Sequence, residues 1–298
     1  MRKIRRRKVA DIYKDVADVV NRLLETQDYP EIYPYSTKDP DDPQKVRYIP
    51  FREIGDSIVG KINRKITKRN VMTFPYNVSA FGMRDQLKDE VFTPMYKTDK
   101  QIWEGDHQPW MLAVLVAQLN DRAIAEVVKG AVDGRDFLKS LTKEVVKKGK
   151  YVSYTTPEFN FPVVHRVTKY DITRITTSLA KLSLKTPTTV LNLHSMVNGI
   201  APNYIHSLDA TLMFLTVEKL LNEGVEDFAL IHDSYGVHAR DVETLATKVR
   251  ESYIHIFENK PLLDFVKQVA PNKLEEANEL MLNDLELKEV MCSDYFFS

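Results

Sequence analysis

The sequence is poor in the residues that mark several common protein classes. Cys292 is the single cysteine among 298 residues, which excludes a disulfide within the chain and fits a reducing compartment. The chain has only 10 glycines and neither a GxGxxG nor a P-loop pattern, which argues against Rossmann and P-loop nucleotide folds. Its longest apolar run, Met111 to Ala117, is far shorter than the ~20 residues of a membrane span. We therefore expect no membrane partner.

An excess of charge of either sign is also absent. The 42 Lys and Arg residues balance 42 Asp and Glu residues, so only local clustering can indicate a nucleic-acid partner. Six of residues 2 to 8 are basic. Such a cluster can contact phosphate groups, act as a nuclear-type localisation signal or simply be a charged terminus exposed to solvent. Asp11 and Asp15 follow before an apolar stretch can form, so this end does not read as a secretion signal.

With 43% apolar residues, the chain can bury a substantial core in one large domain or two smaller ones. Apolar residues at helical spacing predict an amphipathic helix over residues 9–26. Residues 28–50 hold five prolines and read as a loop or insertion, and the helical pattern returns at Ile54. Residues 110–141 predict one or two buried helices.

The second half mixes strands with helices. Residues 151–170 alternate around a turn at 157–160 and predict a β-hairpin, whereas the Thr-rich residues 171–198 read as irregular. Helices are expected after Ile200, interrupted only at 228–238. The pattern as a whole predicts a predominantly helical α+β protein.

The stretch FALIHDSYGVHA, residues 228–239, places two polar side chains after an apolar run. Phe228 to Ile231 reads as a buried strand entering a tight turn, which puts His232 and Asp233 at the exposed edge of a sheet. A carboxylate there is either a turn former or a metal ligand. Taken alone, the stretch favours ordinary turn chemistry for Asp233.

In a second stretch, cationic side chains come first and an aromatic hydroxyl follows. This stretch is GKINRKITKRNVMTFPYNVSAFG, residues 60–82. Four of its residues recur at a spacing of four and share one slowly winding helix face: Arg64, Lys68, Met72 and Tyr76. Lys61, Lys65 and Arg69 add to the positive end. The order suits a nucleoside triphosphate, whose phosphates need cations and whose sugar and base need a flat partner. A solvated basic helix with Met72 and Tyr76 packed inward is the alternative, and Pro75 should disturb the helix beside Tyr76.

Four motifs in order carry a family resemblance: RxxxKRxVMTxxY, GIAPNYIHSLDA at residues 199–210, FALIHDSYG and a final SDYFFS. Together they resemble the single-subunit RNA polymerases of bacteriophages and mitochondria, from about Asp11 to Ser298. The resemblance implies the fingers and palm of a right-hand polymerase with a small antiparallel palm sheet. It implies an N-terminal helix and Pro-rich loop at 1–60, fingers with a nucleotide helix at 61–190, and a palm at 191–298.

The same resemblance implies the roles of individual residues. The incoming triphosphate would be held by Arg64, Lys68 and Arg69. Tyr76 would check the ribose, and Lys68 would also act as an electrostatic clamp and general acid toward pyrophosphate. His206 would lie near the 2′-hydroxyl or the minor groove. Asp233 would bind Mg²⁺ on a palm hairpin, flanked by His232. Asp233, Lys68 and Tyr76 are therefore the expected catalytic residues.

A related DNA polymerase class has a similar nucleotide helix. Those enzymes usually have Glu after the His-Asp pair, where this chain has Ser234, and Phe where Met72 stands. Both differences favour RNA synthesis. One departure from the RNA polymerases is Asn77, where the family normally has Gly, so the exit from the helix is expected to differ.

A larger departure is the absence of a DGxxxGxxH-like segment, which carries the family's first metal-binding aspartate. One carboxylate cannot position two Mg²⁺ ions beside a triphosphate, so the chain by itself should be catalytically incomplete. We therefore expect one subunit of a split phage-type RNA polymerase that works with DNA template, RNA product and NTPs in the cytoplasm of an infected host cell. A companion chain would supply the missing aspartate, and a promoter-melting factor is a further possible partner. The alternatives are a catalytically dead nucleic-acid-binding module and a regulatory protein that binds nucleotide without turnover.

Two surfaces follow from this hypothesis. An apolar seam toward the companion is expected at the strand before Asp233 and along the N-terminal helix at Ile12, Val16, Val20 and Leu23. A hairpin-like region from about Val163 to Leu184 carries five basic residues: His165, Arg166, Lys169, Arg174 and Lys181. In the resembling family a hairpin at this place enters the major groove of the promoter, and an ordinary surface hairpin is the alternative.

Overall fold

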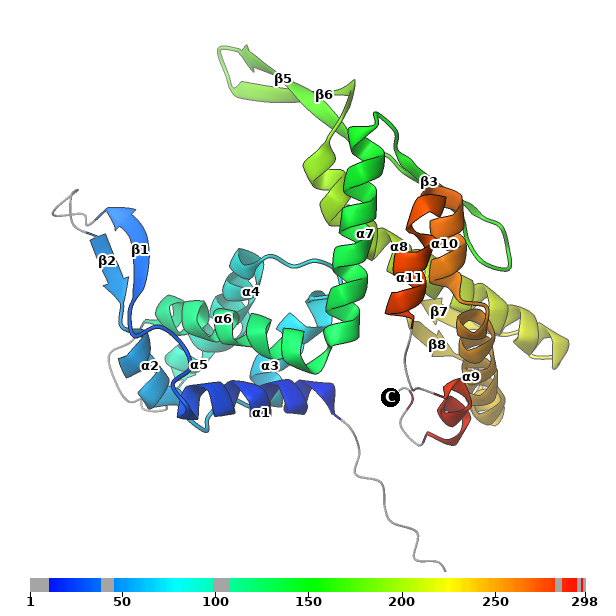
Figure 1. Ribbon diagram of the computed structural model, residues 1–298, viewed down its shortest axis with the longest axis horizontal. Coiled ribbons are helices and arrows are strands. Elements are labelled where there is room, and N and C mark those ends of the chain that lie inside the picture. The colour runs from blue at the N-terminus through cyan, green and yellow to red at the C-terminus, as the bar shows by residue number, and fades with distance from the viewer. Residues whose placement is uncertain (1–10, 39–45, 99–107, 282–285, 294–295, 297–298) are drawn as a thin grey trace, which may run out of the picture. The chain divides into compact units, whose positions relative to one another are not determined.

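The computed structural model describes residues 11–38, 46–98, 108–281, 286–293 and 296 (Figure 1). It divides into two compact units, Met1–Val132 and Asp133–Ser298, which are taken one at a time below. The expected division into segments 1–60, 61–190 and 191–298 concerns functional parts and stays a prediction. The basic run at residues 2–8 lies outside the described residues.

The first unit consists of helices and one hairpin. Its elements are α1 (Ile12–Glu25), β1 (Tyr33–Lys38), β2 (Val46–Ile49), α2 (Phe51–Ile58), α3 (Arg64–Thr73), α4 (Ala80–Leu87), a π-helical turn (Lys88–Phe92), α5 (Thr93–Thr98) and α6 (Pro109–Val127). Helix α7 (Lys129–Lys147) begins at its end and continues into the second unit. The helices predicted at 9–26, after Ile54 and over 110–141 are confirmed, the last as the two helices α6 and α7.

Helix α1 begins where its sequence supplies a cap. The Asp11 carboxylate accepts hydrogen bonds from the backbone N–H groups of Tyr13 at 3.1 Å and Lys14 at 3.3 Å, which satisfies donors that the first helical turn leaves open. The apolar face of α1 is buried within the first unit, with Val16 and Val20 at 0% exposure and Leu23 at 5%. This face is therefore not the expected seam toward a companion chain, because its own unit already covers it.

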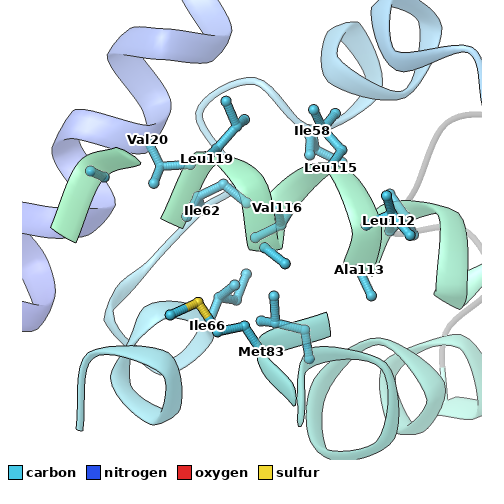
Figure 2. Packing of buried hydrophobic residues seen from close by; sticks show 14 of the residues in the cluster. Val20, Ile58, Ile62, Ile66, Met83, Leu112, Ala113, Leu115, Val116 and Leu119 are labelled. Carbon is cyan, nitrogen blue, oxygen red and sulfur yellow. The ribbon is translucent and has the colours of Figure 1, made fainter. Parts of the chain in front are cut away.

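Helix α6 is the centre of the first unit's core. Its run from Leu112 to Ala117 is buried throughout, since a helix that is apolar on nearly every side must be covered on every side. Figure 2 shows α6 crossing the cluster with Val20 of α1, Ile58 of α2, Ile66 of α3 and Met83 of α4 around it. Each surrounding helix thus takes its place from a side chain that packs on α6.

The loop or insertion expected over residues 28–50 contains two strands, which flank residues 39–45 outside the described residues. Strands β1 and β2 pair in an antiparallel hairpin with Tyr33 opposite Ile49 and Tyr35 opposite Arg47, and the register shifts between Tyr35 and Lys38. Prolines at the ends and edge of a two-stranded sheet cost few ladder hydrogen bonds, so the proline content did not exclude strands here.

The second unit combines helices with three hairpins. After α7 it contains β3 (Val152–Thr155), β4 (Pro162–His165), β5 (Thr168–Thr176), β6 (Lys181–Leu191), α8 (Leu193–Asn222), β7 (Ala229–Ile231), β8 (Ser234–Gly236), α9 (Val242–Glu258), α10 (Pro261–Val269) and α11 (Leu274–Leu280). The predominantly helical α+β class and the hairpin predicted at 151–170 are confirmed. Among the described helices, none has the length and apolar character that crossing a membrane requires.

An aromatic cluster joins β3, α8 and α10 in the second unit. The Tyr154 and Phe265 rings meet edge to face with centroids 4.8 Å apart, and Tyr204 lies 4.9 Å from Phe265. The Tyr154 hydroxyl is 3.1 Å from Ser207 Oγ, so this buried phenol keeps a hydrogen-bond partner. Helix α8 is thereby fixed on two sides despite Pro202 in its interior.

Residues 171–198 are regular, contrary to the expectation of irregular structure. Strands β5 and β6 form a long ribbon in which Arg174 lies opposite Ser183 and Thr176 opposite Lys181 (Figure 1). The β-branched threonines that suggested a loop are residues that favour strands, and pairing with a neighbouring segment completes their hydrogen bonds. The final helical region also begins earlier than expected, at Leu193.

Replacing Leu115 by Ala should destabilise the first unit by about 2–5 kcal/mol, because it leaves a cavity on the central helix at a fully buried position. Urea unfolding followed by circular dichroism measures the loss. The matched control is Leu179→Ala at a side chain that is 96% exposed, where we expect a change of no more than about 0.5 kcal/mol. Equal losses at the two positions would contradict the central place of α6.

Candidate functional site

The cationic helix predicted around residue 64 is α3. The Asn63 side chain caps it by accepting a 3.0 Å hydrogen bond from the Lys65 N–H. Ile66 and Val71 lie on its buried face, whereas Met72 is 44% exposed on the opposite side. Burial of one face turns the cationic face outward, where a ligand can reach it.

Arg64 and Lys68 lie beside a single aromatic ring at the start of α1. The Arg64 Nε is 2.7 Å from Asp11 Oδ2, and its guanidinium carbon is 4.9 Å from the centroid of the Tyr13 ring. The Lys68 Nζ is 5.9 Å from the same centroid, and Lys68 forms no ion pair within the described part of the chain. Arg69 pairs with Glu90 at 3.5 Å. The three cations therefore lie on one helix, where Arg64 pairs with Asp11, Arg69 pairs with Glu90 and Lys68 pairs with no carboxylate among the described residues.

The pKa of the Asp11 carboxyl reflects its contact with Arg64. Desolvation raises its pKa, but the hydrogen bonds from Arg64 and from the N–H groups of Lys14 and Tyr13 together bring the pKa below its ordinary value. Asp11 therefore stays ionised at neutral pH. The pair is solvent-accessible and therefore weak, so a phosphate group can replace Asp11 as the partner of Arg64.

The end of α3 confirms the disturbance expected from Pro75. The helix ends at Thr73, with Phe74 as its cap, so Tyr76 follows the helix in a turn and is 41% exposed. The common helix face thus holds for Arg64, Lys68 and Met72, and its extension to Tyr76 is wrong because Pro75 cannot donate the next helical hydrogen bond.

Asn77 completes this turn with φ at +62°. The left-handed region favours glycine, and Asn is among the few other residues that enter it at modest cost. Asn77 therefore adopts the backbone conformation for which the family's Gly is suited.

In the second unit, His232 and Asp233 form the two-residue loop of the β7–β8 hairpin, since Ile231 pairs with Ser234. His232 has φ at +55°, the left-handed region that a two-residue hairpin loop uses at its first residue. Both side chains are exposed. The hairpin confirms the strand before Asp233, but the expected burial of this strand is wrong, because Ile231 is 68% exposed and Leu230 is 36% exposed.

Two residues that the sequence analysis did not select lie with Asp233: Asp209 on α8 and Tyr235 on β8. Partial burial raises the pKa of the Asp209 carboxyl, His206 lowers it and the Asp233 charge raises it again, with a net upward shift. Burial together with the charges of Asp209 and Asp233 raises the pKa of Tyr235 to about 12. His206 and Asp209 are three residues apart on α8, so they share a helix face. The spacing of His206 and Asp209 within GIAPNYIHSLDA is the sequence feature that could have identified Asp209 as a site residue.

The expected site residues therefore form two groups. Arg64, Lys68, Arg69 and Tyr76 belong to the first unit, and His206, His232 and Asp233 belong to the second. Within the ranges that the structure describes, no three His, Cys, Asp or Glu side chains come together as a metal site. Asp209 and Asp233 are carboxylates, the ligand type that Mg²⁺ prefers, so the second unit offers part of such a site.

A family model for DNA-dependent RNA polymerase matches residues 4–294. The chain belongs to the DNA-dependent RNA polymerase family. It is 30% identical to the DNA-directed RNA polymerase of Enterobacteria phage T3 in an alignment of 321 positions that covers 97% of this chain and 36% of the phage protein. It is 29% identical to T7 RNA polymerase of Escherichia phage T7, with the same coverage of each chain. It is also 26% identical to the mitochondrial DNA-directed RNA polymerase 1 of Arabidopsis thaliana, covering 98% of this chain and 28% of that protein.

Membership of this family confirms the resemblance drawn from the four motifs and sets aside the DNA polymerase class. The chain spans about a third of the length of these relatives or less. Phage and organellar members match nearly the whole of the described chain, so the cationic helix α3 and the β7–β8 hairpin both fall within the family match.

Proposed function

We propose that this chain is the nucleotide-binding and metal-binding part of a phage-type DNA-directed RNA polymerase, which transfers a nucleoside monophosphate from NTP to an RNA 3′-hydroxyl. The observation that carries the proposal is the tip of β7–β8, where Asp233 is exposed in a two-residue loop and interacts with the partly buried Asp209. A loop that only reverses the chain has no need of two neighbouring carboxylates.

The outward face of α3 suits the triphosphate. Arg64 can exchange its exposed ion pair with Asp11 for phosphate oxygens, and Lys68 has no carboxylate to give up among the described residues. Lys68 neutralises the developing charge on pyrophosphate and donates a proton to it as the bond to the α-phosphate breaks. Tyr76, placed after the helix by Pro75, lies at the ribose end.

Asp233 is the proposed Mg²⁺ ligand, with Asp209 as its carboxylate neighbour. When bound, Mg²⁺ supplies neutralisation of the triphosphate and activation of the attacking 3′-hydroxyl. The hairpin holds the Asp233 carboxylate on a short, defined loop, since a displacement of ~1 Å can cost ~10²-fold in rate. His206, on the same α8 face as Asp209, would lie near the 2′-hydroxyl or the minor groove, and His232 flanks Asp233 in the loop on the substrate side.

A companion chain would provide the first metal-binding aspartate and cover the apolar residues of β7. Leu230 and Ile231 are exposed on a sheet of two strands within the described residues, which leaves an edge that another strand can pair with. We place the seam here rather than on α1. The complete enzyme would use DNA template, RNA product and NTPs, and a promoter-melting factor where needed, in the cytoplasm of an infected host cell.

The β5–β6 ribbon is the proposed promoter-reading element. Its register puts Arg174, Lys181 and Lys185 on one face, and Thr173, Ile175, Leu182 and Leu184 on the other. Cations gathered on one face of a ribbon suit phosphates and guanine edges in a major groove. His165 does not belong to this surface: it is 7% exposed and its Nε2 lies 2.8 Å from the Met196 carbonyl oxygen, so it is a core histidine that joins β4 to α8.

The purified chain alone should extend no primer with Mg²⁺ and NTPs, whereas its complex with a companion that carries a DGxxxGxxH segment should polymerise. Primer extension by the lone chain and by the co-expressed complex measures this. Robust synthesis by the lone chain would contradict the need for a companion. A complex that binds primer and template but never extends would identify a catalytically dead module.

Asp233→Asn should lower elongation by the complex by ~10²-fold or more, because it keeps the size of the side chain but removes the charge that holds Mg²⁺. Single-nucleotide extension rates measure the effect, and template affinity should stay nearly unchanged. The matched control is Asp227→Asn at the base of the same hairpin, where Asp227 pairs with His238 at 3.3 Å. Equal rates for the Asp233 variant and wild type would refute the metal assignment.

Tyr76→Phe should raise deoxynucleotide incorporation relative to ribonucleotide incorporation by about tenfold or more, since the group that reads the 2′-hydroxyl is lost. Competition between the two substrates at equal concentration gives the ratio. Tyr151→Phe, which alters a phenol of similar exposure in the second unit, should leave the ratio unchanged. An unchanged ratio in the Tyr76 variant would make that ring a packing residue only.

Changing Arg174, Lys181 and Lys185 together to Gln should abolish preference for the native promoter but leave extension of a preformed primer and template intact. The control changes Ile175, Leu182 and Leu184 to Gln on the opposite face of the ribbon. Transcription from native and scrambled promoters is compared across salt concentrations, and the loss of each phosphate contact should reduce the salt slope by about 0.9. Equal losses from the two faces would make the ribbon a structural element.

A further inference from the structure

Two asparagines are buried in the apolar core of the first unit. Asn70 on α3 and Asn120 on α6 are both 0% exposed, in a cluster that is otherwise built from residues such as Ile66, Met83 and Leu119. An amide is costly to bury unless it forms hydrogen bonds, so its presence in a core indicates a geometric purpose.

The two amides connect three helices. Asn120 Nδ2 donates to Asn70 Oδ1 at 2.8 Å, which joins α6 to α3. Asn70 Nδ2 donates to Gln86 Oε1 at 3.0 Å and lies 3.3 Å from the Met83 carbonyl oxygen, which joins α3 to α4. Thr73 Oγ1 donates to the same Gln86 oxygen at 3.2 Å. The chain of hydrogen bonds thus reaches the last turn of α3.

Apolar packing alone defines the rotation of α3 poorly. The helix has only 10 residues, and its buried face contains two apolar side chains, Ile66 and Val71, beside the polar Thr67 and Asn70. Apolar contacts have no direction, whereas hydrogen bonds demand specific distances and angles. Two residues on this face can therefore fix the angle of α3 about its own axis: Asn70, through Asn120 and Gln86, and Thr67, whose hydroxyl donates to the Tyr13 carbonyl oxygen at 2.7 Å.

A small rotation of α3 would matter at its outer face. At the ~5–6 Å radius of a helix with its side chains, a turn of ~20° moves a side-chain atom by ~2 Å. A misplacement of ~1 Å can already cost ~10²-fold in rate. Lys68 and Arg64 point away from the buried face, so their positions depend directly on this angle.

The network is not optimal for stability. Asn120 Oδ1 is buried and has no hydrogen-bond partner within the described residues. An unsatisfied buried acceptor opposes folding, whereas a leucine pair would fill the same places without that cost. The arrangement is explained by a requirement for direction rather than for stability.

We propose that Asn70 and Asn120 are positioning residues that set the rotation of α3, and through it the placement of Lys68 and Arg64 against the triphosphate. The inference rests on the proposed role of α3 as the nucleotide helix. It adds a second requirement to that role: hydrogen bonds on the buried side of the helix must hold it at one angle about its axis.

The test compares variants in the polymerising complex. Asn and Leu side chains have the same number of heavy atoms and the same branching, so Asn70→Leu with Asn120→Leu removes every polar group of the pair at nearly constant shape. Asn120→Leu alone leaves Asn70 Oδ1 unpaired. Gln86→Met removes the acceptor of Asn70 at a half-buried and more tolerant position. Thr142→Val, at a buried hydroxyl without a partner in the described part of the second unit, is the control.

We expect the double variant to unfold at or above the wild-type temperature, because both polar groups are removed together. Its KM for NTP should nevertheless rise by about tenfold or more, and its preference for ribonucleotides should fall, with primer and template affinity unchanged. Gln86→Met should change KM in the same direction by a smaller factor. Asn120→Leu should lose stability as well as NTP affinity.

A folded double variant with wild-type KM and wild-type sugar preference would overturn the inference, because the amides would then serve packing alone. If the double variant fails to fold, an unchanged KM in Gln86→Met overturns it equally. A similar change of KM in Thr142→Val would also overturn it, as an unspecific effect of core substitution. A wild-type complex that extends no primer would instead overturn the proposed function, which separates the two failures.

Discussion

The burial of α6 is the constraint on which the first unit depends. A helix that is apolar from Leu112 to Ala117 on every side must be surrounded, and α1, α2, α3 and α4 supply the surrounding faces. Each of these helices is amphipathic, so burial of one face decides which side chains face water. The outward cations of α3 are a consequence of this packing, since Ile66 and Val71 take the inner side.

In the first unit, the cations of α3 are held by exposed contacts that a phosphate ligand could replace. Arg64 and Lys68 share the Tyr13 ring, and Arg64 also pairs with Asp11, so the cations are ordered before a phosphate arrives. Exposed ion pairs and ring contacts are weak, so they would orient the side chains without competing strongly with the triphosphate that we propose as the ligand. The contacts of Arg64 and Lys68 on the outer face of α3 and the hydrogen bonds of Asn70 on its buried face both restrict the positions of the two cations.

The second unit presents the proposed metal-binding carboxylate differently. Asp233 lies at the end of a short hairpin with exposed apolar residues on β7, in a two-residue loop that His232 enters with positive φ. A two-stranded sheet this short is only marginally stable by itself. Its Tyr235 packs against a small apolar cluster that contains Val225 and Val249, together with residues of α8 and α9. Asp209, which interacts with Asp233, and His206 beside it come from a long helix that the aromatic cluster holds in place.

By itself, the sequence determined the helical elements, the hairpin at 151–170, the end of α3 at Pro75 and the family motifs, because capping, periodicity and proline chemistry act locally. It also indicated Arg64, Lys68, Tyr76 and Asp233. Only the tertiary structure decided that β5 and β6 pair, that His165 is a core residue and that Asp209 joins Asp233. The β5–β6 strands are neighbours in the chain, but their Thr-rich sequence lacks a clear alternation of apolar and polar residues, so the pattern did not reveal the pairing. The meeting of α8 with His165 and with the β7–β8 hairpin depends on contacts between distant segments, which no local pattern encodes. The Asn70 to Asn120 contact is of the same kind, since 50 residues separate its two partners in the chain.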